Sequence, residues 1–185
     1  IIACLVGSEM CIRDSKTTLG DPIAQPNALT VIEHTGSTTQ TVVVGNKVNI
    51  GTIHNWYSNF NPVISNNIFT LPSGYYYYLE TNVQSYKVGT SSSWSLMTIS
   101  FQHYDETNSS NIGTEASNYG NYGNSADNFL HNRDECAKAL IDCTSSSRDI
   151  SIKILSNAGN YDRINYNTGQ GYSGLGRTVI WQLDP

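Results

Sequence analysis

The sequence carries little charge, and this shortage limits the partners that the protein can bind. Only 14% of its 185 residues are Asp, Glu, Lys or Arg, and the formal net charge is −5. No Lys/Arg cluster is dense enough to follow a phosphate backbone, so we expect no nucleic-acid partner. The sequence also lacks an apolar run of about 18 residues, so we expect no insertion into a membrane as a helix.

Strong helix formers are also scarce, and familiar catalytic motifs are missing. Ser, Thr, Asn, Gly and Tyr are abundant instead, a mixture that is typical of strands and turns. No Gly-x-Ser-x-Gly nucleophile elbow occurs, and the Gly-rich stretch 169–176 lacks the strand–loop–helix setting of a nucleotide-binding loop. At this length we expect one domain with a single core, and we expect that it is not an enzyme.

Residues 1–15 differ in character from everything that follows. Within them, residues 5–15 (LVGSEMCIRDS) resemble the in-frame translation of a sequencing-library adapter. We therefore treat 1–15 as a non-native segment, which removes Cys4 and Cys11 from the cysteine count and favours a metagenomic source. A natural N-terminal strand or a truncated signal peptide is the alternative.

Several short segments alternate between apolar and polar residues, as half-buried strands do. The clearest is 148–155, where Ile150, Ile152 and Ile154 alternate with polar residues. Because turn signals and no amphipathic helices separate these segments, we expect an antiparallel sandwich or barrel. The expected strands are 47–60, 68–71, 75–86, 94–104, 135–142, 148–155, 161–166 and 177–183.

The remaining segments are expected to lie outside the sheets. Residues 16–46 are Thr-rich with two prolines and suit an extended N-terminal arm, which leaves 47–185 as the head domain. The polar, irregular stretch 105–132 is expected to form a long exposed loop. In the segment 75–86, period-two alternation places Tyr75 and Tyr77 on one face and Tyr76 and Tyr78 on the other, and we expect one of these faces to be core.

Cysteine, histidine and carboxylate residues offer few arrangements for a metal ion. Cys136 and Cys143 could form a local disulfide or remain two buried thiols, and both are favoured over a zinc site. Calcium is possible through loop carboxylates, but no Asp-x-Asp-x-Asp-Gly loop is present, and we predict no metal site. The carboxylates are Asp105, Glu106, Asp134, Glu135 and Asp142, and the scattered histidines are His34, His54, His103 and His131.

One segment is more specific than the general strand pattern. Residues 68–78 (IFTLPSGYYYY) resemble the signature of the globular heads of the complement C1q and tumour necrosis factor (TNF) superfamily. In such heads a Phe-bearing strand reaches a Pro, then a Gly, then an aromatic strand. The resemblance covers about 47–183 and implies a jelly-roll sandwich, homotrimers, and binding without catalysis. A collagen-like stalk is absent, and Trp181-Gln182-Leu183 replaces the usual apolar ending, so the ligand class does not follow from the resemblance.

Tyrosine residues are the candidate contact residues. Tyr119, Tyr122 and Tyr172 lie among Asn, Ser and Gly, the composition of adaptable recognition loops, and we predict that they bind the ligand; packing on a trimer neighbour is the equal alternative. If their face is not core, Tyr76 and Tyr78 are candidates for the trimer interface.

Similar heads occur on phage tail fibres and other viral appendages. We therefore expect a receptor-binding head on a virion surface or in an extracellular setting, which binds a host-surface glycan or protein. A secreted lectin-like or adhesin module is the second hypothesis. A sandwich-fold glycoside hydrolase is the third, and it would need two carboxylates facing a sugar at a defined separation.

Overall fold

The computed structural model of the chain describes residues 28–34, 40–56, 60, 62–86, 95–122, 133–158, 163–164 and 176–185. These residues form strands and turns, and none of them belongs to a helix that could cross a membrane. The predicted adapter-like segment 1–15 lies outside the described residues.

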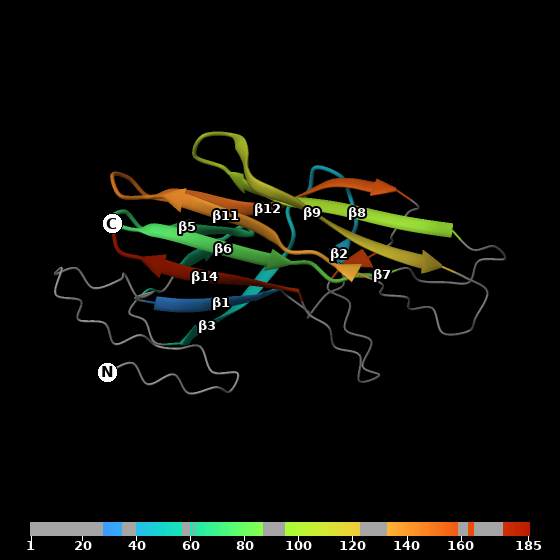
Figure 1. The fold of residues 1–185 in the computed structure, drawn as a ribbon, viewed down its shortest axis with the longest axis horizontal. Coiled ribbons are helices and arrows are strands. Elements are labelled where there is room, and N and C mark those ends of the chain that lie inside the picture. Colours follow the sequence, from blue (N-terminus) through green and yellow to red (C-terminus); the bar gives the residue numbers. More distant parts are fainter. Residues whose placement is uncertain are drawn as a thin grey trace, which may run out of the picture.

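Two antiparallel sheets pack face to face in a jelly-roll-like sandwich, as the sequence predicted (Figure 1). The five-stranded sheet contains, in spatial order, β11 (Ala137–Asp142), β6 (Tyr76–Asn82), β14 (Arg177–Leu183), β1 (Ala28–His34) and β3 (Ile50–Trp56). The six-stranded sheet contains β10 (Arg133–Asp134), β9 (Ser110–Tyr122), β8 (Ser95–Asp105), β12 (Arg148–Ala158), β5 (Ile68–Leu71) and β4 (Val63–Ser65). A small third sheet contains β2 (Gln40–Thr41), β13 (Arg163–Ile164) and β7 (Ser85–Tyr86).

The core lies between the two large sheets and follows the period-two alternation of their strands. On β11, Ala137, Ala139 and Ile141 point inward, and the residues between them are exposed. This confirms the strand predicted at 135–142. The six-stranded sheet contributes inward residues that are fully buried, and each such Ile or Phe stabilises the fold by roughly 1.5–3 kcal/mol. They include Phe69, Leu71, Phe101, Ile150, Ile152 and Ile154.

The segment with the signature carries the chain from one sheet to the other. Phe69 lies on β5 in the six-stranded sheet, and the aromatic residues after the Pro72–Gly74 turn lie on β6 in the five-stranded sheet. Gly74 adopts a φ of +101° and donates its N–H to the Cys143 carbonyl at 2.8 Å. Tyr77 is fully buried, so the face with Tyr75 and Tyr77 is the core face.

The extended arm predicted at 16–46 is not found in the part of this segment that the structure describes, 28–34 and 40–46. Strand β1 lies inside the five-stranded sheet, hydrogen-bonded to both β14 and β3. The chain then stays on the sandwich, because Gly45 and Val48 donate their N–H groups to carbonyls of β12, each at 2.8 Å. The Thr-rich composition is compatible with strand, since the buried Thr30 hydroxyl donates to the Phe60 carbonyl at 3.3 Å.

The long loop predicted at 105–132 is also wrong for most of its described part, 105–122. The chain turns back within four residues, 106–109, and continues as the thirteen-residue strand β9. Its alternation was hidden because two of its inward residues are the small Ala116 and the polar Asn118. The Asn118 side chain is buried, and its amide nitrogen donates to the Val83 carbonyl inside the sandwich.

A bulge in β9 closes one side of the sandwich. The β8–β9 register shifts between Phe101 and His103, and Gly113 lies in the shifted segment with a φ of +73°. Here β9 approaches β11 of the other sheet, and Lys138 donates its N–H to the Thr114 hydroxyl at 3.0 Å. A Cβ at residue 113 would overlap the Lys138 carbonyl oxygen and lie 2.7 Å from the Ala139 Cβ.

Candidate binding surface

The outer face of the five-stranded sheet carries an unusual number of apolar side chains. The inward positions of its strands already supply the core, so outward positions on an antiparallel sheet would ordinarily be polar. Here the outward positions hold aromatic and aliphatic residues on four neighbouring strands. We call this surface the aromatic face; it is made up of Leu29, Tyr76, Tyr78, Leu140, Trp181 and Leu183.

One row of directly opposed residues crosses the aromatic face. Strand register pairs Leu140 with Tyr78, Tyr78 with Trp181, and Trp181 with Leu29. The Tyr78 and Trp181 rings lie with their centroids 5.3 Å apart and their planes tilted by 41°. Such aromatic pairs stabilise beyond their area burial. Leu140, at the end of the row, is 67% exposed.

The charges beside this row are paired with each other. Lys138 and Glu80 lie opposite on β11 and β6, with their charged atoms 3.1 Å apart. The hydrogen bond with Glu80 raises the pKa of Lys138 above its usual value. In the same row, Val179 and Val31 continue the apolar character across β14 and β1. Lys138 and Glu80 thus offset each other's charge within the face, and the row of Leu140, Tyr78, Trp181 and Leu29 itself carries no charge.

The outer face of the six-stranded sheet is different, because polar side chains there bond to one another. Glu106 accepts a hydrogen bond from the Ser151 hydroxyl at 2.7 Å and pairs with Lys47 at 3.2 Å and Lys153 at 3.8 Å. Partial burial alone would raise the pKa of Glu106, but these partners outweigh it and lower the pKa. Lys153 also lies over the Tyr104 ring, 3.1 Å from its centroid. This face is suited to solvent.

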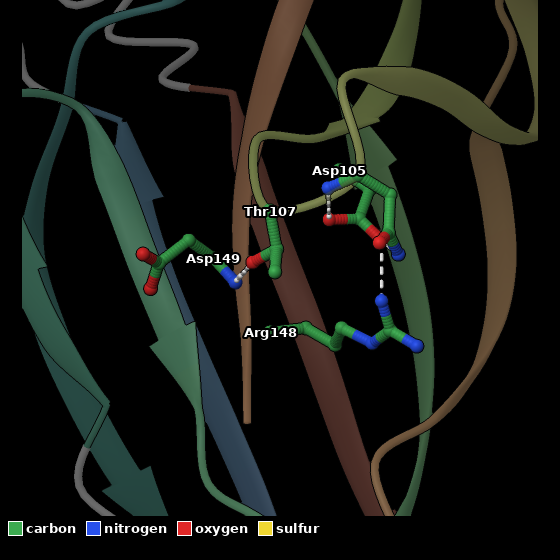
Figure 2. A network of polar contacts seen from close by, with 5 residues as sticks. Asp105, Thr107, Arg148 and Asp149 are labelled. Carbon is green, nitrogen blue, oxygen red and sulfur yellow. Dashed lines mark hydrogen bonds and ion pairs between the residues drawn. The ribbon is translucent and has the colours of Figure 1, made fainter. Parts of the chain in front are cut away.

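The turn between β8 and β9 is fixed to the start of β12 by polar contacts (Figure 2). The buried Asp105 carboxylate accepts from the Asn108 backbone N–H at 3.0 Å and from its side-chain amide at 2.7 Å, and it pairs with Arg148 at 3.5 Å. The Asp149 N–H donates to the Thr107 hydroxyl at 3.0 Å. Asp105 and Glu106 were candidates for catalysis or calcium binding. Their carboxylates instead make contacts that hold neighbouring strands together.

The predicted ligand-binding tyrosines are only partly placed. Tyr119 lies on β9, paired in register with Thr98 and Arg133, and is 39% exposed. Tyr122 is the last residue of β9, and its side chain, like all of Tyr172, lies outside the described residues. The end of β9 that carries Tyr119 lies at the opposite end of the sandwich from the C-terminus (Figure 1).

Of the two alternatives left open for Cys136 and Cys143, a local disulfide and two free thiols, the structure has the free thiols. Both residues remain thiols, and they flank opposite ends of β11. A strand of this length separates their Cα atoms by about 20 Å, whereas a disulfide requires less than about 7 Å. Cys143 is buried, and burial raises the pKa of its thiol to about 11.

Two of the four histidines take part in a buried polar chain that the sequence did not reveal. We call it the His–Thr chain. The His34 Nε2 lies 3.1 Å from the Thr178 hydroxyl oxygen, the Thr81 hydroxyl donates to Thr178 at 2.8 Å, and the His103 Nε2 lies 2.8 Å from the Thr81 hydroxyl oxygen. All four side chains are fully buried. The chain links β1, β14 and β6 of one sheet to β8 of the other.

Among the residues that the structure places, no group of three or more His, Cys, Asp or Glu side chains could hold a metal ion. The Asp142 carboxylate, for example, is occupied by hydrogen bonds from the Thr144 hydroxyl and N–H, which lower its pKa. In comparisons with known proteins, no family model and no curated protein matches the sequence.

Proposed function

We propose that the chain is a non-catalytic recognition head that assembles as a homotrimer through the aromatic face. The observation that carries this proposal is the contrast between the two outer faces. On the six-stranded sheet, polar side chains satisfy one another and the exposed Val63 and Tyr119 lie apart on β4 and β9, whereas the five-stranded sheet gathers the exposed Leu140 beside the stacked Tyr78 and Trp181. Apolar surface collected on one face is typical of a protein interface.

A second copy of the chain fits this face better than a charged partner does. Its charged groups near the centre, Lys138 and Glu80, neutralise each other, so two copies would not repel. Five strands at about 4.8 Å spacing and about 20 Å length give a surface of roughly 500 Å², which is near the lower limit of what one partner contributes to a specific contact. Covering half-buried residues such as Tyr78 and Trp181 would stabilise association by roughly 1 kcal/mol each.

The resemblance to the C1q and TNF heads supports the same assembly. Its signature segment forms β5, the turn and β6, so Tyr76 and Tyr78 lie on the face away from the core, as the trimer hypothesis required. The engagement of Asp105 and Glu106 in structural contacts supports binding rather than catalysis.

The proposed setting is a virion surface, such as a phage tail fibre, or another extracellular appendage. There the head would bind a host-surface glycan or protein. The exposed Tyr119 on the six-stranded sheet is available for this contact, because it lies away from the aromatic face and stays accessible in the proposed trimer.

Two substitutions with matched exposure test the assembly. Leu140→Glu places a charge on the aromatic face, where Leu140 is 67% exposed, and Val63→Glu places one on β4 of the other sheet, where Val63 is 68% exposed. Sedimentation velocity of the full chain should show that Leu140→Glu dissociates the trimer and that Val63→Glu leaves it intact. Equal behaviour of the two variants would contradict the proposed interface, and the circular dichroism of both should match the unchanged protein.

A further inference from the structure

The hydrogen bonds of the His–Thr chain run in one direction, because each Thr hydroxyl has one hydrogen to donate. Because the Thr81 hydroxyl donates to Thr178, its oxygen can only accept from His103, so the proton of the neutral His103 ring is on Nε2. The Thr178 hydroxyl hydrogen is then available to His34 Nε2. Each of the four side chains therefore has a defined place in one relay of donors and acceptors.

A further proton on His103 would have to bind Nδ1. This atom is buried and has no hydrogen-bond partner among the described residues. The residues that oppose His103 on its neighbouring strands are Ile152 on β12 and Ile112 on β9, both apolar. Of the titratable side chains placed by the structure, His34 alone joins the chain, and a second imidazole cannot neutralise a positive charge.

We propose that the His–Thr chain is an acid-sensitive lock, which joins the two sheets at neutral pH and lets them separate when His103 takes up a proton. In the closed sandwich the described residues offer no acceptor for the new N–H, and none of their charged groups acts on His103 to balance the positive charge. When the sheets separate, water solvates both. The proposal does not depend on trimer formation or on the ligand.

The size of the effect follows from the titration of His103. Burial lowers the pKa of His103 from 6.5 to about 4. Since the folded-state pKa is lowered, the open state binds more protons between these values, and stability is lost as the pH falls through this window. The ratio of open to closed molecules should rise roughly 30-fold between pH 7.5 and pH 5.

Carboxylates act in a different pH range, which separates their contribution from that of His103. The pKa values of Glu106 and Asp142 are lowered from ordinary values of 4.5 and 3.8, so their stabilisation is complete above those values and is lost only in stronger acid. A loss of protection against hydrogen exchange that begins near pH 6.5 is therefore caused by protonation of a histidine and not of a carboxylate.

His103→Gln tests the lock, because the Gln side-chain amide can still donate to Thr81 but does not titrate in this range. Hydrogen exchange of the full chain would be measured by mass spectrometry in peptides from β6, β8 and β14, at pH 7.5 and pH 5, and corrected for intrinsic exchange. We expect the opening ratio to rise roughly 30-fold in the unchanged protein and to rise much less in His103→Gln. An equal rise in both proteins would overturn the proposal.

A measurement on the unchanged protein covers the case in which His103→Gln does not fold. The ring proton shifts of His103, followed by NMR, should show no titration down to pH 5 while the protein is folded. Titration of His103 near pH 6.5 in the folded protein would show that the ring is charged without cost, and the lock would be refuted.

Discussion

Replacing Gly113 with alanine should destabilise the protein more than the same change at Gly45 or Gly74, the other two glycines for which the structure gives a positive φ. Two effects add at this position. A side chain at a φ of +73° costs about 1–2 kcal/mol, and the new Cβ would overlap the Lys138 carbonyl and press on Ala139 at 2.7 Å. Overpacking of this kind costs about 1–3 kcal/mol. We therefore expect a loss of about 3–4 kcal/mol, a large part of a typical stability of about 5–15 kcal/mol.

Gly74→Ala is the matched control for this prediction. Gly74 also has a positive φ, +101°, but no atom lies within 4 Å of its added Cβ. Urea denaturation should therefore show a loss of only about 1–2 kcal/mol for Gly74→Ala. If Gly113→Ala lost no more than Gly74→Ala, the close approach of β9 to β11 that closes the sandwich would be refuted.

Three further predictions concern other parts of the fold. Thr81→Val should lower the unfolding free energy in urea by about 2–3 kcal/mol, because the His103 Nε2–H loses its buried acceptor; a loss below about 0.5 kcal/mol would argue against the His–Thr chain. Alkylation of the folded protein without reductant should leave Cys143 unmodified, because its thiol is buried. Alkylation after denaturation should label both Cys136 and Cys143. A disulfide-linked peptide in the mass spectrum would contradict the separation of the two thiols. Tyr119→Ala should weaken capture on a glycan array or on host cells about tenfold without changing the subunit number, and unchanged capture would remove Tyr119 from the binding site.

The sequence predicted the strands whose two faces differ strongly. Residues 68–71 and 177–183 coincide with β5 and β14, because fully buried residues alternate there with less buried ones. Strand β9 was missed because its inward positions include the small Ala116 and the polar Asn118, which weaken the apolar period. Strand β1 was missed because its Thr-rich surroundings resemble those of an arm, although its neighbours in the sheet lie far away in sequence.

The candidate site was predictable only in part, for a similar reason. Alternation separates Tyr76 and Tyr78 from Tyr77, but aromatic residues on both faces leave the core side undecided until the sheets are in place. The contact of Tyr78 with Trp181 joins strands about a hundred residues apart, and strand order decides it. The His–Thr chain likewise joins four positions from distant parts of the sequence, so no local pattern could indicate it.

The proposed assembly is tested most directly by the mass of the full chain in solution. Light scattering during size exclusion would be recorded over a range of dilutions, with reductant present so that Cys4 and Cys11 cannot link chains. A homotrimer would have three times the 20.3 kDa mass of one chain, and this is the expected result. A mass of one chain at every concentration would contradict the trimer and leave the aromatic face to another partner.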